Sequence, residues 1–392
     1  MRYSFDAPVD RFGTNSVKYD EMPNAETIPL WVADMDFETA PVIREALVQR
    51  MQHGCFGYTF VPDSFYQSTI QWFARRHGWQ GIRREWFIYT SGVVPAISAI
   101  IKALTVPGDK VLVQSPVYNC FYSSIRNNGC ELADVPLVYV DARYTIDFES
   151  FERACSDPRV KVFLLCNPHN PAGRVWTKEE LTTIGDICLR HNVFVIADEI
   201  HCEFVNKGYR YTPFASISEA FAQHSATCVS PSKAFNLAGL QIANIIVPDA
   251  EVRSRVDRAI NINEVCDVNP FGVIALQAAY TPEGEEWLDQ LNAYIYANYE
   301  FAKSFIDERM PQLHVTALEG TYLMWVDIAD LTEQGSDAFA ETLLTSANVY
   351  VNPGTMYGSE SGRKFIRINL ATQRARLQEA LLRILSVVQP DA

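Results

Sequence analysis

The sequence predicts an α/β protein, with a large domain around a mostly parallel, mixed sheet and a smaller α+β domain. Three observations support this prediction. The chain has 392 residues, which is enough for two domains. In its middle, short apolar runs alternate with helical patterns, as expected for strands of a parallel sheet joined by helices. At about residue 280 this alternation ends and a different pattern begins.

The apolar runs of the large domain are expected to be its strands. They are WFIYT (86–90), KVLVQSP (110–116), KVFLLCNP (161–168), VFVIADE (193–199), ATCVSPS (226–232) and ANIIVP (243–248). Helical patterns follow the first three runs, at 96–104, 118–127 and 177–191. Because crossovers between parallel strands are right-handed, the carboxyl ends of these strands should meet at one edge, where ligands bind.

The smaller domain is predicted from the pattern after residue 280. A long helix should begin at PEGEEW and continue through Asp307. GTYLMWVDI (320–328) and KFIRINLA (364–371) are predicted strands, with one helix between them and another at the end. The first 30 or so residues are irregular and rich in aromatic side chains. We therefore expect an N-terminal segment (1–35) that joins the small domain (281–392), and a large domain at 36–280.

Composition narrows the classes of partner. The net charge of −14 argues against nucleic acid or an anionic membrane as the main partner. The nine cysteines are scattered, odd in number and without C-x-x-C spacing, which indicates reduced thiols and not a disulfide framework or zinc site. The sequence shows no signal-peptide pattern and no apolar run near the roughly 18 residues of a membrane span. We expect a cytoplasmic protein.

Polar residues cluster directly after the predicted strands. Since parallel strands end at one edge, these residues should meet there. The set holds a turn at a helix start, an aromatic ring, an amide, a carboxylate, hydroxyls and an amine, and it lacks ligands at metal spacing. Its members are Ser91, Gly92, Tyr118, Asn170, Asp198, His201, Ser230, Ser232 and Lys233.

These groups match the requirements of pyridoxal 5′-phosphate. Its aldehyde needs a lysine amine, and its pyridine nitrogen needs an acid that keeps it protonated. Its phosphate needs backbone N–H groups at a helix start. Its ring face accepts an aromatic side chain, and its ring oxygen needs hydrogen-bond donors.

Each residue also has a simpler explanation. Lys233 could be a surface lysine, Asp198 a helix N-cap, and Ser91-Gly92 an ordinary turn. Tyr118 and His201 taken alone fit a buried core better than a binding site. Asn170 stands between prolines, a pattern typical of turns. Only their joint occurrence at successive strand ends favours the cofactor site.

A resemblance to a known family supports the cofactor site. The ordered series NPHNPAGR, ADEIH, SPSK and FIRINLA, together with PLWVADMDF (29–37), FGYTF (56–60) and SGVVPAIS (91–98), resembles the fold-type I, pyridoxal-phosphate-dependent aminotransferase superfamily of class I/II. Within this superfamily, these motifs are most similar to those of the MalY/PatB-type cystathionine β-lyase branch. The resemblance covers almost the whole chain and implies the aspartate aminotransferase-like fold of type I.

The resemblance also implies roles for individual residues. Lys233 would bond to the cofactor aldehyde and act as general base, and Tyr118 would stack on the ring and assist catalysis. The remaining implied cofactor contacts are Asp198 at the ring nitrogen, Asn170 and His201 at the ring oxygen, and Gly92, Val93, Ser230 and Ser232 at the phosphate. Tyr58 would reach the phosphate of a neighbouring subunit, which implies a homodimer with shared active sites.

Arg367 is implied as the residue that binds the substrate carboxylate. Strand alternation in FIRINL agrees, because it places Ile366 and Ile368 on one face and Arg367 with Asn369 on the other. A guanidinium group matches a carboxylate with two parallel hydrogen bonds. Gln241 stands where aminotransferases often carry a phosphate-binding arginine, which weakens the aminotransferase interpretation.

The sequence thus predicts a carbon–sulfur β-lyase that acts on L-cystathionine or a related cysteine S-conjugate and yields thiol, pyruvate and ammonia. One alternative is an aminotransferase, which would use the same cofactor contacts. Another, of a different class, is a cofactor-binding regulatory or interaction protein.

Overall fold

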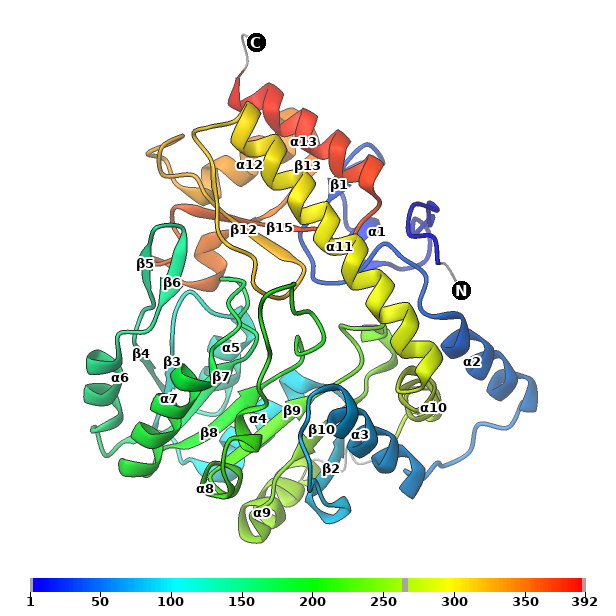
Figure 1. Cartoon of the computed structure of the whole chain (residues 1–392), viewed down its shortest axis with the longest axis vertical. Coiled ribbons are helices and arrows are strands. Elements are labelled where there is room, and N and C mark those ends of the chain that lie inside the picture. Colours follow the sequence, from blue (N-terminus) through cyan, green and yellow to red (C-terminus); the bar gives the residue numbers. More distant parts are fainter. Residues whose placement is uncertain (1–2, 263–266, 390–392) are drawn as a thin grey trace.

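Two β-sheets form the framework of the protein, as the computed structural model in Figure 1 shows. The structure describes residues 3–262 and 267–389. A seven-stranded sheet is built from residues 87–246, and a four-stranded sheet is built from residues 314–369. The two sheets occupy the lower and upper halves of the view, so the predicted α/β fold with a second α+β unit is confirmed.

The seven-stranded sheet is mixed, as predicted. Its strand order is β2-β10-β9-β8-β7-β3-β4, and every neighbouring pair is parallel except the two made by β10, which is antiparallel to both β2 and β9. The strands are β2 (Phe87–Thr90), β3 (Lys110–Val113), β4 (Glu131–Asp134), β7 (Val160–Cys166), β8 (Phe194–Asp198), β9 (Ser225–Val229) and β10 (Ala243–Ile246).

Helices cover both faces of this sheet, because its central strands are apolar on both sides. Along β7, Val162 and Leu164 pack with α4, α5 and α9, whereas Phe163 and Leu165 pack with α6, α7 and α8. These helices are α4 (Val93–Leu104), α5 (Asn119–Asn127), α6 (Phe148–Cys155), α7 (Lys178–Arg190), α8 (Glu219–Gln223) and α9 (Ala250–Asn261). A small hairpin of β5 (Val138–Val140) and β6 (Arg143–Thr145) lies beside them.

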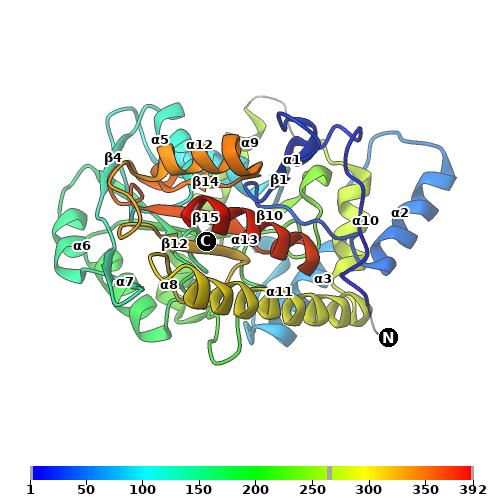
Figure 2. The same cartoon turned by 90° about the horizontal axis from the view of Figure 1, so that it is seen from above.

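The four-stranded sheet is antiparallel, in the order β11-β12-β15-β14. Figure 2 shows α11 and α13 running side by side over it. The elements of this part are α11 (Pro282–Arg309), β11 (His314–Val315), β12 (Leu323–Asp327), α12 (Ser336–Ala347), β13 (Val349–Tyr350), β14 (Asn352–Pro353), β15 (Phe365–Asn369) and α13 (Arg374–Val388).

The predicted long helix is α11, which begins where Thr281 accepts a hydrogen bond from the backbone of Gly284 and ends two residues after the predicted Asp307. The predicted strand at 320–328 is shorter. β12 begins only at Leu323, because Thr321 has a left-handed backbone with φ 69° that a strand cannot include.

The N-terminal segment crosses to the C-terminal part of the chain. It contains α1 (Val17–Asp20) and β1 (Ile28–Pro29), and β1 pairs in parallel with β13. The chain then continues into α2 (Pro41–His53) and α3 (Asp63–Arg76), which pack against α10 (Pro270–Ala279).

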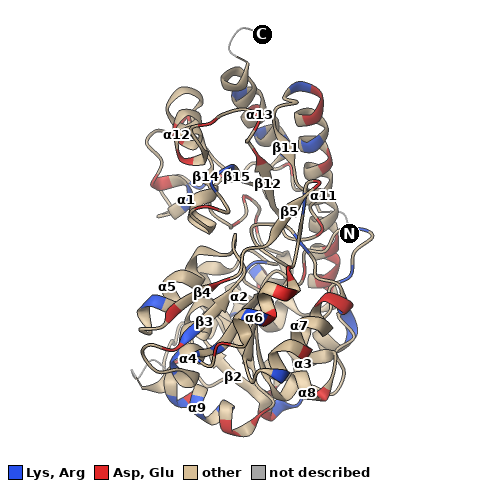
Figure 3. Cartoon of the chain, turned by 90° about the vertical axis from the view of Figure 1, so that its left-hand side faces the viewer, with Lys and Arg blue, Asp and Glu red and all other residues tan. Residues whose placement is uncertain are grey.

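The structure also bears on membrane-spanning helices, on the cysteines and on the distribution of charge. No helix among the described residues has both the length and the apolar composition needed to cross a membrane. The eight described cysteines are free thiols, and Cys266 lies outside the described residues. Figure 3 shows acidic and basic residues interspersed along the helices in that view.

Candidate active site

A cavity of about 420 Å³ lies at the carboxyl ends of the parallel strands, between the two sheets. Its lining comes from the ends of β7 and β8, the segment after β9, the start of α4 and the four-stranded sheet. Of the predicted residues, it contains Gly92, Val93, Tyr118, Asn170, Asp198, His201, Ser232, Lys233 and Arg367. The structure thus brings together residues that are far apart in the sequence.

Lys233 lies in the segment that follows β9 and reaches into this cavity. Its Nζ donates a hydrogen bond of 2.7 Å to the backbone oxygen of Ala33. Desolvation lowers the pKa of Lys233, and the positive charge of Arg367 acts in the same direction, whereas Asp34 opposes it. The amine can therefore lose its proton more readily than a surface lysine.

Asp198 is the last residue of β8 and is 3% exposed. Its burial raises its pKa to about 7, although a hydrogen bond of 3.2 Å from the backbone of Ile200 and the charge of Lys233 both favour the ionised form. A buried carboxyl group of this kind favours a positively charged partner inside the cavity.

Arg367 extends from β15 and is held on three sides. Its Nη1 donates to Oδ1 of Asn170 at 3.1 Å, and its Nη2 donates to the backbone oxygen of Trp31 at 2.7 Å. Its guanidinium carbon lies 4.7 Å from the ring centre of Tyr357. Its buried Nε has no hydrogen-bond partner among the described residues.

Tyr118 and His201 line the same cavity. Burial raises the pKa of Tyr118 well above its ordinary value, and the neighbouring Cys120 adds to this shift. Burial lowers the pKa of His201, with contributions from Lys233 and Arg367, so its imidazole is neutral. Within the described chain, Nδ1 of His201 has no hydrogen-bond partner, which makes it a candidate contact for a ligand.

The other end of the cavity is suited to an anion. Gly92 precedes the first turn of α4, and Gly92, Val93 and Ser232 line the cavity there. Free backbone N–H groups at a helix N-terminus attract phosphate. Ser230 is buried and lies behind this wall, where its hydroxyl donates to the backbone of Ile242 and accepts a 3.0 Å hydrogen bond from the backbone of Ser232.

Tyr58, like Ser230, is a predicted residue that does not line the cavity. It lies between α2 and α3, on the stretch that extends away from the rest of the chain at the right of Figure 1, and it is 97% exposed. Phe60 is also largely exposed there. The prediction that Tyr58 serves a neighbouring subunit stays a prediction.

Several lining residues were not predicted from the sequence. Trp31 and Ala33 contribute backbone oxygens, and they belong to the motif PLWVADMDF, whose side chains indicate no such contact. Tyr357 and Cys120 are typical core residues by type, so no signal distinguished them. Gln241, the departure noted in the sequence, also lines the cavity, with a left-handed backbone at φ 53°.

One group outside the cavity resembles a metal site. His77, Cys202 and Glu203 place potential ligand atoms within 4.8 Å of one another. The Glu203 carboxylate, however, already accepts hydrogen bonds of 2.6 Å from both Trp72 and Arg76. An ion-pair network explains this group without a metal ion.

Comparison with known proteins identifies the relatives of the chain. Cystathionine beta-lyase PatB of Bacillus subtilis is 40% identical over 97% of this chain and 98% of its own length. The crystal structure of cystalysin from Treponema denticola, which contains pyridoxal 5′-phosphate, aligns with a TM-score of 0.95 and 34% identity over the full length of both chains. A pyridoxal-phosphate-bound aminotransferase candidate from Clostridium difficile 630 aligns with a TM-score of 0.95 and 42% identity over 99% of this chain and 100% of its own.

The family pattern agrees with these likenesses over nearly the whole chain. The pattern of aminotransferase class I and II matches residues 25–384, which include every lining residue of the cavity. The chain therefore belongs to the aminotransferase class I and II family.

Proposed function

We infer that the protein is a pyridoxal-phosphate-dependent carbon–sulfur β-lyase, which cleaves L-cystathionine or a related cysteine S-conjugate into a thiol, pyruvate and ammonia. The observation that carries the inference is the convergence of Lys233, Asp198 and Arg367 on one cavity. Full-length likeness to PatB, a cystathionine beta-lyase by name, favours the lyase over the transferase.

The residues present fit the cofactor. Asp198 is buried with a raised pKa, so a positively charged ring nitrogen would stabilise its carboxylate. Nδ1 of His201 lacks a partner within the described chain, and Asn170 lines the same cavity. The start of α4 offers backbone donors for a phosphate. When bound, pyridoxal 5′-phosphate supplies an electron sink that stabilises negative charge at the substrate α-carbon.

Lys233 has the properties of the general base. Its lowered pKa lets the free amine take the proton from the substrate α-carbon and then deliver it to the departing sulfur. Tyr118, which lines the same cavity, is the second proposed proton donor. Burial raises its pKa, so its hydroxyl stays protonated and able to donate.

Arg367 supplies the carboxylate-binding group. Its contacts with Asn170, Trp31 and Tyr357 fix the plane of the guanidinium before a substrate arrives. A prearranged group loses less conformational freedom on binding than a mobile one. Substrates that lack an α-carboxylate should therefore bind poorly.

We further propose a cytoplasmic homodimer, with Tyr58 reaching the phosphate site of the partner subunit. The exposed rings of Tyr58, Phe56 and Phe60 support a protein interface on this stretch. We also keep the division at residues 35 and 280 as a proposal. The pairing of β1 with β13 supports the assignment of the first segment to the small domain.

A direct assay tests the function. Purified protein loaded with cofactor should release pyruvate from L-cystathionine without an added keto acid, and Lys233→Ala should release none. Product formation that depends on a keto acid would instead establish an aminotransferase. A biological effect that survives Lys233→Ala would favour the regulatory alternative.

A further inference from the structure

Residues 31–37, which we name the strap, lie between β1 and α2 without forming a helix or strand. Side chains from distant parts of the chain hold this segment. Each backbone carbonyl from Trp31 to Phe37 accepts a hydrogen bond from a side chain. Such an arrangement fixes the positions of these oxygens without a sheet or helix.

Two of these oxygens contact the reactive cations of the cavity. The carbonyl of Trp31 accepts a 2.7 Å hydrogen bond from Arg367, and the carbonyl of Ala33 accepts one of 2.7 Å from Lys233. Tyr322 also donates to the carbonyl of Ala33, at 2.9 Å. The strap therefore sets the resting positions of both groups that the proposed function uses.

An asparagine follows each cation closely in the sequence and binds the same strap. Asn369 stands two residues after Arg367, is fully buried, and donates at 2.7 Å to the carbonyls of both Val32 and Asp34. Side chains two residues apart in a strand lie on the same face, so Arg367 and Asn369 approach the strap together.

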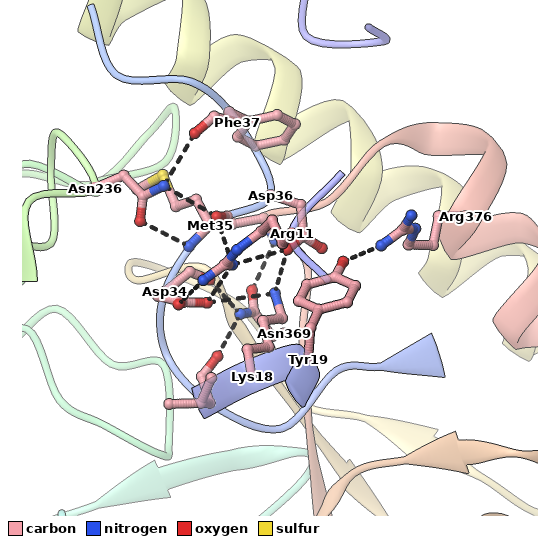
Figure 4. A network of polar contacts seen from close by, with 12 residues as sticks. Arg11, Lys18, Tyr19, Asp34, Met35, Asp36, Phe37, Asn236, Asn369 and Arg376 are labelled. Atoms are coloured by element: carbon pink, nitrogen blue, oxygen red, sulfur yellow. Dashed lines mark hydrogen bonds and ion pairs between the residues drawn. The ribbon is translucent and has the colours of Figure 1, made fainter. Parts of the chain in front are cut away.

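Asn236 follows Lys233 by three residues and also binds the strap. Its Nδ2 donates to the carbonyls of Met35 and Phe37 at 3.0 and 2.9 Å, and its Oδ1 accepts from the backbone of Met35 at 3.1 Å. Figure 4 shows both asparagines in contact with the strap. The backbone of Asn236 is left-handed, at φ 56°, a conformation that asparagine tolerates.

Buried charges hold the side chains of the strap. Arg11 donates to both Asp34 and Asp36, and Lys18 lies 3.0 Å from the carboxylate of Asp36. Lys18 and Asp36 are fully buried. If either Lys18 or Asp36 moved away, the other would stay buried without its nearest opposite charge, which is strongly unfavourable. The pair therefore favours this single arrangement of the strap.

We propose that Asn369 and Asn236 are positioning residues, which set Arg367 and Lys233 respectively by fixing strap carbonyls close to those that these cations contact. The proposal rests on the proposed roles of Arg367 in carboxylate binding and of Lys233 in catalysis. The main effect of each asparagine should fall on the cation beside it in the sequence, because Asn369 shares β15 with Arg367 and Asn236 follows Lys233 in the same segment.

The test uses cofactor-loaded protein and two substitutions, of which Asn369→Ser shortens the side chain and Asn236→Asp keeps its shape. Asn369→Ser removes both donors to the strap, and Asn236→Asp removes the donors while keeping the acceptor and a residue that tolerates the left-handed backbone. Asn298→Ser is a matched control. Asn298 is fully buried and donates to two backbone carbonyls, of Leu370 and Thr372, but it does not contact the strap.

Two measurements separate positioning from general loss of structure. One compares the dissociation constants of L-alanine and ethylamine, which differ by the carboxylate and have no leaving group at the β-carbon. The other is the pH midpoint of the visible absorption band of the loaded protein, which reports on the nitrogen of Lys233.

Asn369→Ser should weaken L-alanine binding about tenfold, equivalent to one misplaced charge-assisted hydrogen bond, and should change ethylamine binding less than about twofold. Asn236→Asp should shift the midpoint of the band by about half a pH unit or more and leave the ratio of the two dissociation constants unchanged. Asn298→Ser should lower the melting temperature without either effect.

The proposal is overturned if Asn369→Ser weakens both ligands equally, or if Asn236→Asp leaves the midpoint unchanged. If either variant does not fold, Asn369→Thr, which suits a strand, and Asn236→Gly, which suits the left-handed backbone, take their places. These readouts do not need elimination, so absence of pyruvate formation by the unmodified protein would refute the proposed function separately.

Discussion

The substitution Asp198→Asn should make the cofactor-free protein more stable at neutral pH while removing its activity. Burial raises the pKa of Asp198 from 3.8 to about 7. The folded state therefore favours the protonated carboxyl group. This contribution to stability is fully present below pH 3.8 and is lost as the pH rises toward about 7.

The size of the effect follows from the two pKa values. At 1.36 kcal/mol per pKa unit, ionisation of Asp198 destabilises the folded state by about 2 kcal/mol at pH 5 and about 4 kcal/mol at pH 8. Asparagine has nearly the same shape and does not ionise. Urea unfolding of cofactor-free protein at these two pH values measures the difference between the variant and the unmodified chain.

Glu199 serves as an internal check, because its burial also raises its pKa to about 7. Both proteins should therefore lose stability as the pH rises, and only the difference between them belongs to Asp198. Cofactor binding should reverse the order of stability, since a positively charged ring nitrogen stabilises the carboxylate. If Asp198→Asn is equally or less stable than the unmodified chain at pH 8 without cofactor, the assignment of Asp198 as a desolvated carboxyl group is wrong.

Three further predictions test other parts of the structure. Arg367→Lys should raise the KM for an amino-acid substrate about tenfold or more, because an ammonium group cannot bind Asn170 and the substrate in the same plane; steady-state kinetics measure this. Burial opposes ionisation of Glu203, yet His77 and Arg76 lower its pKa to about 2, so its stabilising effect is present above pH 4.5 and lost as the pH falls toward 2. Glu203→Gln should thus cost about 3 kcal/mol in urea unfolding at pH 7. Gly362→Ala should cost about 3 kcal/mol in the same assay, because the added Cβ would lie 1.9 Å from the oxygen of Gly354.

The central strands could be predicted because burial on both faces requires continuous apolar runs. β8, with all five residues buried, is such a strand. The edge strand β4 is mostly exposed and has no apolar run, so its residues could not be recognised as a strand. The antiparallel direction of β10 was also not predictable, since an apolar run has the same character in either direction.

The site was predictable where its residues follow parallel strands, because topology alone brings such residues to one edge. This applies to Lys233 and Asp198. The strap is different, because Ala33 contacts Lys233 through its backbone oxygen across 200 positions of sequence. Every residue type has that oxygen, so residue type cannot reveal the contact.

The cavity contains polar and charged groups whose burial without a ligand destabilises the fold, and the strap fixes their positions. Asp198 has a raised pKa, Lys233 a lowered one, and the described chain offers Nε of Arg367 no partner. Relaxation of the strap would let such groups find better contacts, but this would disrupt the buried pairing of Lys18 with Asp36. Stability and activity should therefore change in opposite directions when Asp198 is replaced, and in the same direction when the buried charges behind the strap are replaced.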